Sequence, residues 1–222
     1  MPDVVDWGLR EYSESLEAMR ALVRARREGS VPDTLVLVEH PPVVTVGVEG
    51  DDGSAANSGL PVVLVERGGR ATYHGPGQLV GYPIVDLGSR GHDVRRFVHD
   101  VEEVVVRALE PFGVRAGHVS GRRGVWVEGE RKIASIGIAV DHWVTFHGFA
   151  LNVDPDLGAF DRFHPCGFSG SVMTSLARET GRPIAVAAVA PHVRDAWTSV
   201  FGPVPASPEG PESHSAPRTV HA

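Results

Sequence analysis

Two residues that occur once each, Lys132 and Cys166, are the first candidates for chemistry. The 222-residue chain contains 21 Lys and Arg, and Lys132 is its only lysine. Arginine stays protonated at any accessible pH, whereas a buried lysine can lose its proton and act as a base. A single lysine at the start of the apolar stretch KIASIGIAV therefore indicates a site where deprotonation matters. The competing interpretation is an exposed lysine without a role.

Cys166 stands in a Pro-Cys-Gly turn, before a segment (167–181) that is predicted to contain a helix. Most lone cysteines are small buried hydrophobes. A turn before a helix is a poor place for a core residue, however, and the positive end of a helix favours the thiolate. The pattern therefore favours a nucleophile.

The two residues form one hypothesis, in which Lys132 takes the thiol proton of Cys166 or pairs with the thiolate. A histidine is the alternative base, as in cysteine hydrolases. The candidates are His74, His147 and His164. The sequence does not order these bases by distance from the thiol.

The segment RGGRATYHGPGQLVGYP, residues 67–83, contains the densest cluster of glycines. Glycine lets backbone approach a ligand closely. Polar and aromatic side chains lie between the glycines, so we expect this segment to form a wall of an extended substrate site rather than a structural turn. It matches neither a phosphate-binding P-loop nor a dinucleotide fingerprint.

Composition excludes several classes of protein. The formal net charge of −7 argues against a nucleic-acid binder. One cysteine rules out an intrachain disulfide and Cys-x-x-Cys metal sites, and the 11 histidines show no helical metal-binding spacing, so we expect no metal. The N-terminus lacks the pattern of a signal peptide, and no apolar run is long enough to span a membrane. We therefore expect a cytoplasmic protein.

The order of elements predicts an α/β or α+β fold, with a sheet that carries packed helices. Apolar periodicity predicts helices over 8–29, 93–112, part of 167–181, and 185–201, the last bent near Pro191. Strands are predicted over 34–40, 43–47, 61–69 and 78–87, followed by a three-stranded meander within 124–153. Residues 1–202 are predicted to form one catalytic domain. The Pro- and Ser-rich residues 203–222 are predicted to be a disordered tail.

The motifs resemble those of the lipoyl(octanoyl) transferase family. RGGRATYHGPGQLVGYP is similar to the signature of that family, and KIASIGI, FHGFALNV and PCG followed by TSL match its later motifs in order and spacing. The resemblance covers residues 5–202. It implies a mixed sheet flanked by helices, like the catalytic domain of biotin and lipoate protein ligases, and a reaction that needs no ATP, metal or other cofactor.

The resemblance also implies the reaction and its partners. Octanoyl moves from acyl carrier protein to a cysteine, and then to a lysine of a lipoyl domain in a 2-oxoacid dehydrogenase subunit or of glycine cleavage H protein. Cys166 falls on the acyl-thioester nucleophile and Lys132 on the residue that lowers its pKa. The implied substrate contacts are Arg67, Gly68, Gly69, Arg70, Ala71, Thr72, Tyr73, His74, Ser135, Ile136, Gly137, Gly148, Phe149 and Ala150.

Three other functions remain open: an ATP-dependent lipoate ligase of the same fold, a non-catalytic module that binds acyl carrier protein or lipoyl domains, and a cysteine hydrolase. Two details are also expected. Arg122, Arg123 and Arg131 are candidates for a basic patch that offsets the negative charge of the chain toward an acidic carrier protein. Gly137 and Gly148 are expected to leave room for the acyl chain.

Overall fold

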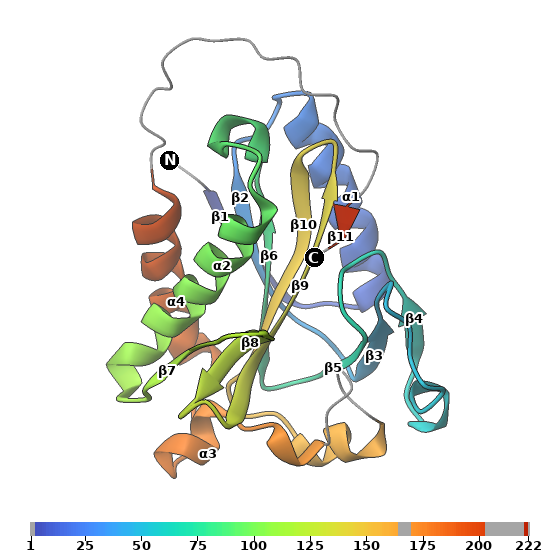
Figure 1. The fold of residues 1–222 in the computed structure, drawn as a ribbon, viewed down its shortest axis with the longest axis vertical. Helices are drawn as coiled ribbons and strands as arrows, with labels where there is room; N and C mark the ends of the chain where they lie inside the picture. Colours follow the sequence, from blue (N-terminus) through green and yellow to red (C-terminus); the bar gives the residue numbers. More distant parts are fainter. Residues whose placement is uncertain (1–2, 164–169, 203–219, 222) are drawn as a thin grey trace.

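The computed structural model describes residues 3–163, 170–202 and 220–221, and its centre is a mixed eight-stranded sheet (Figure 1). The strands of this sheet are β1 (Asp3–Leu9), β2 (Thr34–Glu39), β6 (Gln78–Ile84), β7 (Ala116–Val119), β8 (Arg122–Val127), β9 (Arg131–Asp141), β10 (Val144–Asn152) and β11 (Val220–His221). Their order is β1-β2-β6-β10-β9-β8-β7, and β11 pairs with β9. β1 and β2 run parallel, whereas β2, β6, β10, β9, β8 and β7 pair with their neighbours in antiparallel fashion.

A second, three-stranded sheet and the helices complete the fold. The small sheet has the order β4 (Val62–Leu64), β3 (Val43–Val46), β5 (Ala71–His74). The helices are α1 (Tyr12–Arg27), α2 (Val94–Leu109), α3 (Leu176–Thr180) and α4 (Val186–Phe201), with 3₁₀ turns at Ala55–Asn57, Leu87–Arg90, Glu110–Phe112, Leu157–Arg162 and Gly170–Val172.

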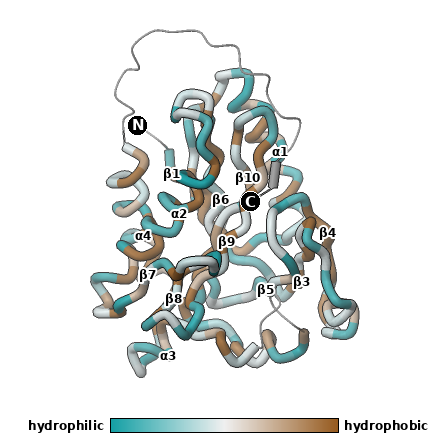
Figure 2. Tube along the Cα trace, viewed as in Figure 1, coloured by the Kyte–Doolittle hydropathy of each residue, from teal (hydrophilic) through white to brown (hydrophobic). Residues whose placement is uncertain are grey.

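Helices cover both faces of the large sheet. α2 and α4 pack together on one face, where they alternate hydrophobic and hydrophilic residues along their length (Figure 2). α1 packs on the other face, against β6 and β10, and the small sheet lies near this side (Figure 1). Burial of apolar area against both faces is the main stabilising contribution of this layered arrangement.

The prediction of a helix over 8–29 was wrong at its start. Residues up to Leu9 belong to β1, and α1 begins at Tyr12. Gly8 has a left-handed φ of 61°, and the side chain of Leu9 is 66% exposed, so Leu9 lies on no buried helical face. The end of the helix is as expected, because Gly29 follows it with a left-handed φ of 70°.

The predicted meander is confirmed as the antiparallel strands β8, β9 and β10. Both turns contain left-handed residues, Glu128 with Gly129 and His142 with Trp143, which is typical of tight hairpins. The strands over 34–40 and 43–47 and the helices over 93–112 and 185–201 are also confirmed, and α4 continues through Pro191. The strand predicted over 78–87 ends at Ile84, and only Val62–Leu64 of the strand predicted over 61–69 is formed. β5 and β7 were not predicted.

The predicted helix within 167–181 is confirmed as α3 in the part of this segment that the structure describes. A 3₁₀ turn occupies Gly170–Val172, and α3 begins only at Leu176, capped by Ser175. α3 therefore starts ten residues after Cys166 in the sequence, so the cysteine does not directly precede this helix. Cys166 and His164 themselves lie outside the described residues, as do 203–219 of the predicted tail. The tail residues Val220 and His221 form β11, opposite Val140 and Ala139 of β9.

Candidate functional site

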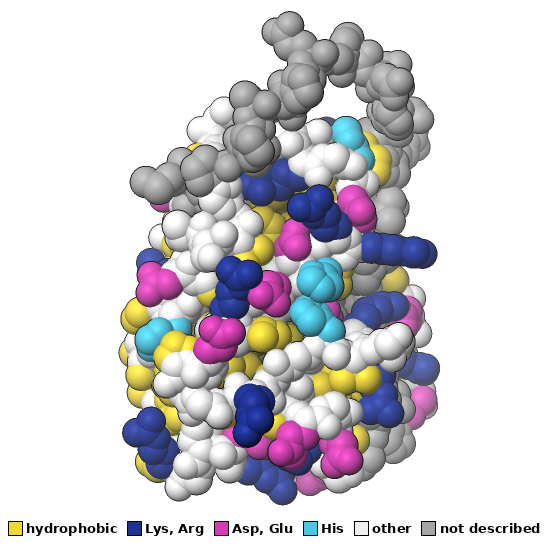
Figure 3. All heavy atoms as spheres, turned by 60° about the vertical axis from the view of Figure 1, so that its left-hand side comes forward, with side chains coloured by type: hydrophobic (Ala, Val, Ile, Leu, Met, Phe, Trp, Pro, Cys, Tyr) yellow, Lys and Arg dark blue, Asp and Glu magenta, His cyan; other side chains and the backbone are white. Residues whose placement is uncertain are grey.

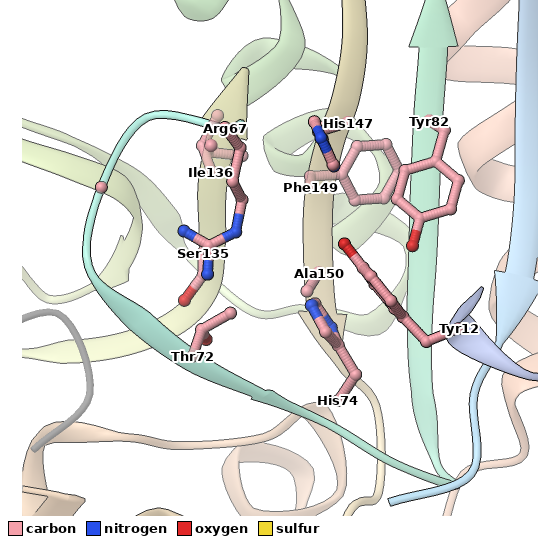
Figure 4. Close-up of a pocket in the computed structure, with 13 residues that line it drawn as sticks. Tyr12, Arg67, Thr72, His74, Tyr82, Ser135, Ile136, His147, Phe149 and Ala150 are labelled. Carbon is pink, nitrogen blue, oxygen red and sulfur yellow. The ribbon is translucent and has the colours of Figure 1, made fainter. Parts of the chain in front are cut away.

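A cavity lies on the α1 side of the large sheet, between the sheet, α1 and β5 (Figure 4). It encloses about 420 Å³, including the space at its mouth. Its walls come from the start of α1, the turn before β5, β5 itself, and the neighbouring strands β6, β9 and β10. The lining residues are Tyr12, Arg67, Gly69, Thr72, His74, Tyr82, Ser135, Ile136, Gly137, His147, Gly148, Phe149 and Ala150.

The structure brings together most of the predicted substrate contacts in this one cavity. Ten of them line it: Arg67, Gly69, Thr72, His74, Ser135, Ile136, Gly137, Gly148, Phe149 and Ala150. Their convergence follows from pairing. β9 and β10 are antiparallel neighbours with Ser135 opposite Ala150 and Gly137 opposite Gly148. Two motifs separated by a hairpin therefore meet on one surface.

Four predicted contacts do not line the cavity. Ala71 and Tyr73 lie on the opposite face of β5 from Thr72 and His74, because side chains alternate along a strand. They pack in a core cluster, in which Tyr73 meets the ring of Phe160 edge to face. Arg70 is exposed. Gly68 instead donates its N–H to the carbonyl of Ile138 in β9 at 3.0 Å, and so ties the turn to the sheet.

Sequence reasoning missed Tyr12 and Tyr82 as cavity residues. Tyr12 falls within the segment predicted as the first helix, and its position at the first turn of α1 turns it toward the cavity (Figure 4). Its ring stacks on His74, with centroids 5.7 Å apart and planes 12° apart. Tyr82 lies in β6 and bonds to His40. Nothing in the local pattern separates either tyrosine from ordinary core residues.

Arg67 places a buried positive charge beside the cavity. One terminal nitrogen (Nη2) donates to the carbonyl and hydroxyl oxygens of Thr45, both at 2.8 Å, and the other (Nη1) donates to the carbonyl of Gly68 at 3.0 Å. A Cβ at Gly137 would lie 2.8 Å from the carbonyl oxygen of Gly68 and 2.9 Å from Cδ of Arg67, and a Cβ at Gly47 would overlap the carbonyl oxygen of Gly69. These glycines therefore make room for the backbone of the 67–69 turn and for its arginine rather than for a ligand.

Two buried histidines next to Tyr12 remain neutral near pH 7. Burial lowers the pKa of His40 to about 4 and holds that of His74 well below its usual range. Nδ1 of His40 donates to the carbonyl of Arg10 at 2.7 Å, so its Nε2 accepts from the Tyr82 hydroxyl at 2.7 Å. Each neutral ring thus offers one donor and one acceptor to fixed partners.

His147 is the third cavity histidine and occupies a strained position. It lies within β10 yet has a left-handed φ of 57°. Its Nε2 lies 3.5 Å from one carboxylate oxygen of Glu66, Oε2, and Arg20 donates to the other, Oε1, at 2.9 Å. The proximity of His147 is the largest influence on Glu66 and lowers the pKa of this carboxyl group to about 2. For His147 itself, burial lowers the pKa more than the Glu66 carboxylate raises it, so the pKa of the histidine is lowered.

Lys132 is buried at the start of β9, with 3% of its surface exposed. Its Nζ lies 5.6 Å from the centre of the Trp126 ring. A β-bulge between β8 and β9 occurs here, because Trp126 pairs with Lys132 while Val125 pairs with Ala134. A Cβ at Gly124 would lie 2.8 Å from Cε of Lys132, so this glycine leaves room for the lysine side chain.

The backbone of Lys132 pairs with the segment that follows Cys166. Lys132 forms an isolated parallel bridge with Met173, and its carbonyl accepts from the N–H of Thr174 at 3.0 Å. Met173 comes seven residues after Cys166. Phe163, three residues before Cys166, packs in the same core cluster as Met173. Described residues on both sides of the cysteine are therefore held near Lys132 and β5.

The arginines of the expected basic patch are largely neutralised. Arg131 pairs with Glu179 and Glu128, both at 2.9 Å, and Arg123 pairs with Glu49 at 2.7 Å. On the face formed by α2 and α4, basic and acidic side chains are interspersed (Figure 3). The described residues contain no group of three His, Cys, Asp or Glu that could hold a metal ion, and none of the helices that the structure describes is long and apolar enough to cross a membrane.

Comparison with known proteins identifies the family. Residues 11–198 match the model of the lipoyl protein ligase A/B catalytic domain. The chain belongs to this family. Among curated relatives, the octanoyltransferase of Geobacter sulfurreducens is 45% identical over 224 residues, which covers 99% of this chain and 93% of that protein. The octanoyltransferase of Rubrobacter xylanophilus is 47% identical, covering 88% of this chain and 91% of that protein.

Solved structures of the family and its neighbours share the fold. A lipoate-protein ligase A bound with ATP superimposes with a TM-score of 0.75 at 18% identity, covering 90% of this chain and 85% of that one. A biotin protein ligase from Aquifex aeolicus gives a TM-score of 0.54 at 12% identity, covering 90% and 70%. The predicted fold class, a mixed sheet flanked by helices like that of these ligases, is confirmed.

The surroundings of Gly148 correct the expectation that this glycine leaves room for the acyl chain. Gly148 lines the cavity with its backbone, but a Cβ at this position would overlap the carbonyl oxygen of Gly81 in β6 and approach Cδ of Pro83 to 2.5 Å. Gly148 therefore permits the close approach of β10 and β6, and it does not widen the cavity. Ala150, two residues further along β10, is the small cavity residue next to Tyr12 and His74 (Figure 4).

Proposed function

We propose that this protein transfers an octanoyl group from octanoyl-acyl carrier protein to a lysine of a lipoyl domain. Cys166 is the nucleophile that carries the acyl group as a thioester, and Lys132 is the residue that activates it. The acceptors are lipoyl domains of 2-oxoacid dehydrogenase subunits and glycine cleavage H protein. The reaction requires no nucleotide, because each acyl intermediate before the final amide is itself a thioester.

The first step exchanges one thioester for another. The thiol proton of Cys166 passes to Lys132, the thiolate attacks the acyl carbon, and the carrier thiolate leaves and regains a proton from the lysine. In the second step the acceptor amine attacks the Cys166 thioester, forms an amide, and gives its proton to the neutral lysine as the cysteine thiolate leaves. A residue that can be both charged and neutral suits both steps, which arginine does not.

The cavity is the observation that carries this proposal. Ile136, Phe149 and Ala150 give it apolar surface for an acyl chain, and it runs along β9 from Ser135 toward Gly137. Lys132 precedes Ser135 by three residues, about 10 Å of strand. A chain lying along β9 and β10 would therefore have its carbonyl end toward Lys132 and its methyl end deeper in the cavity.

The backbone N–H groups of the glycine-rich turn are poor candidates for the oxyanion donors. The N–H of Gly68 donates to Ile138, that of Gly69 to the Glu49 carboxylate at 3.1 Å, and that of Gly77 to the Glu39 carboxylate at 3.0 Å. These donors are therefore already used inside the fold. We expect the stabilising donors for the tetrahedral intermediate to come from elsewhere around the cavity.

A lipoate ligase that activates its substrate with ATP is the competing function of the same fold. The similarity to the octanoyltransferases, 45% and 47% identity over most of each chain, favours transfer, whereas the ATP-bound ligase shares 18% identity. The ligase alternative requires no cysteine nucleophile. The two functions therefore differ in whether an acyl adduct forms on the protein without ATP.

Mass spectrometry of the intact protein tests the proposal. Incubation with octanoyl-acyl carrier protein, without ATP, should add one octanoyl group to Cys166, and a lipoyl domain should then remove it. Cys166→Ala should fold normally, form no adduct and transfer nothing. Transfer by Cys166→Ala, or a requirement for ATP, would refute the cysteine mechanism, and release of free octanoate without amide formation would indicate a hydrolase.

A further inference from the structure

A continuous line of hydrogen bonds joins the cavity wall to the backbone of Lys132. Nδ1 of His74 lies 2.7 Å from Oε1 of Gln78. Nε2 of Gln78 donates to Oδ1 of Asn152 at 2.9 Å. Nδ2 of Asn152 donates to the carbonyl of Thr174 at 2.9 Å, and the N–H of Thr174 donates to the carbonyl of Lys132 at 3.0 Å. We call these five residues the polar line.

The polar line is shielded from water. Gln78 and Asn152 are each 1% exposed, Thr174 is fully buried, and His74 is 6% exposed. Bonds of this kind are stronger in a low-dielectric interior than in water, and neighbouring bonds in a chain polarise one another. A buried polar group that loses its partner also costs its full desolvation penalty. Rearranging the polar line would therefore cost free energy, and its residues are expected to keep one arrangement.

The direction of every bond follows from carbonyl groups, which can only accept. Because Thr174 presents a carbonyl, Asn152 must turn its NH₂ toward it and its oxygen toward Gln78. Gln78 then turns its NH₂ toward that oxygen and toward the carbonyl of Tyr73, which lies at 3.2 Å. The remaining oxygen of Gln78 faces His74, so Nδ1 of the histidine carries the proton.

This arrangement leaves Nε2 of His74 unprotonated beside the cavity. Its neighbour is the hydroxyl of Thr45 at 3.4 Å, which accepts from Arg67 and can direct its own hydrogen to the histidine. His74 also stays neutral because it is buried. The cavity therefore contains a hydrogen-bond acceptor whose identity is set by the orientation of Gln78, which the shorter bond to Asn152 and the longer bond to the Tyr73 carbonyl fix together.

We infer that Asn152 is a positioning residue that fixes the tautomer of His74 and holds the Lys132 backbone in register with Thr174. This inference rests on the proposed function for its kinetic consequences, but the state of His74 is independent of activity. Asn152 touches neither Lys132 directly nor the cavity lining. Its effect on the reaction passes through Gln78 on one side and Thr174 on the other.

Two substitutions separate the two halves of this role. Asn152→Leu removes both bonds of Asn152 and leaves only the longer bond to the Tyr73 carbonyl, 3.2 Å, to orient the Gln78 amide. His74 should then populate a second tautomer, visible in the ¹⁵N spectrum of labelled histidine. Asn152→Asp keeps an oxygen for Gln78, so His74 should keep its Nδ1–H tautomer. When protonated, the new carboxyl group donates to Thr174; when ionised, it faces that carbonyl with an oxygen, and the bond is lost.

The kinetic readout is formation of the octanoyl adduct per folded molecule, with iodoacetamide alkylation against pH as a second probe of the only cysteine. Misplacement of reacting groups commonly costs one or two powers of ten, so Asn152→Leu should acylate about tenfold or more slowly, with a shifted alkylation midpoint. Asn152→Asp should acylate at the rate of the natural protein at low pH and more slowly than it as pH rises and the new carboxyl group ionises.

Thr145→Val is the matched control. Thr145 is fully buried in the same strand, and its hydroxyl donates to the carbonyl of Pro83 at 2.7 Å and accepts from the N–H of Val85 at 3.0 Å. Its loss should lower stability without changing the His74 tautomer or the acylation rate of the folded protein. If Asn152→Leu does not fold, Asn152→Asp decides the question through its pH dependence.

The outcomes are distinct. A single Nδ1–H tautomer in Asn152→Leu overturns the first half of the inference, and natural acylation rates in both Asn152 variants overturn the second. If the unmodified protein forms no adduct on Cys166, the proposed function fails. In that case the His74 spectrum of the Asn152 variants still decides whether Asn152 fixes the histidine.

Discussion

Lys132, the residue that we propose activates Cys166, is held in place by three features of its surroundings. Burial against Trp126, the missing side chain at Gly124 and the β-bulge of β9 all act on its position. A compact ammonium group at the end of a flexible stem can occupy such a site. The planar, permanently charged head of arginine cannot accept a proton, so we expect that it does not replace the lysine in the proposed mechanism.

Substitution of Lys132 should separate these roles. We expect Lys132→Ala and Lys132→Arg both to lose about 10²- to 10⁴-fold in overall transfer, the range of general acid–base contributions. The arginine variant should acylate Cys166 better than it completes transfer, because only the amine step requires a neutral base. Single-turnover measurements of adduct formation and decay check this, and near-normal transfer by Lys132→Arg would reduce the lysine to a counter-ion.

At the scale of elements, close pairing of β6 with β10 forms one wall of the cavity. The pairing requires a glycine on each strand. A Cβ at Gly81 of β6 would overlap the ring of Phe149 in β10, and a Cβ at Gly148 of β10 would overlap the carbonyl of Gly81 in β6. The cavity floor is therefore set by backbone approach. Its free volume is adjusted instead by side chains such as that of Ala150.

Two substitutions in β10 should consequently behave differently. Ala150→Leu should fold and shift the preferred donor toward acyl chains shorter than octanoyl, because its side chain occupies part of the cavity. Gly148→Ala should lower the free energy of unfolding by about 1–3 kcal/mol or more through overpacking. Urea titration and a series of acyl donors measure both effects.

Gly117→Ala in β7 is the control for these substitutions, because a Cβ there meets nothing within 4 Å. A shortened chain preference in Gly148→Ala with normal stability would show that Gly148, and not Ala150, borders the acyl chain.

At the scale of the whole molecule, the buried histidines link stability to pH. The folded pKa of His40, about 4, lies below the ordinary value of 6.5 because the ring is buried. Between these two values the unfolded chain binds a proton that the folded protein does not, so stability falls as pH falls through this window. Burial lowers the pKa of His74 and His147 too, so they act in the same direction.

The contribution of His40 is measurable. Acidification from pH 7 to 4.5 should cost about 2 kcal/mol of unfolding free energy through this residue. His40→Gln can still donate to the Arg10 carbonyl and has no ionisable ring, so its loss of stability over the same interval should be smaller by about that amount. Urea unfolding at both pH values tests this, and an unchanged difference would show that His40 is not the titrating group.

Local sequence determined the features that depend on residue type and on neighbours along the chain. The meander and the glycine-rich turn could be predicted, because hydrophobic periodicity and turn chemistry act over a few residues. The only lysine could be singled out as a candidate because arginine occupies every other basic position. Most of the cavity residues were implied by the resemblance to the transferase family, and the pairing of β9 with β10 brings two of its separate motifs together. The roles of Cys166 and Lys132 remain predictions on the same basis.

Tertiary structure alone decided the features that depend on which surfaces meet. Tyr12 and Tyr82 read as core residues until α1 packs over β6 and β10, and Gly148 could have faced either a ligand or a strand until β6 was placed beside it. The tautomer of His74 depends on Thr174, a hundred residues away in the chain. Such facts follow from the direction of side chains and from long-range pairing, for which no local pattern contains a signal.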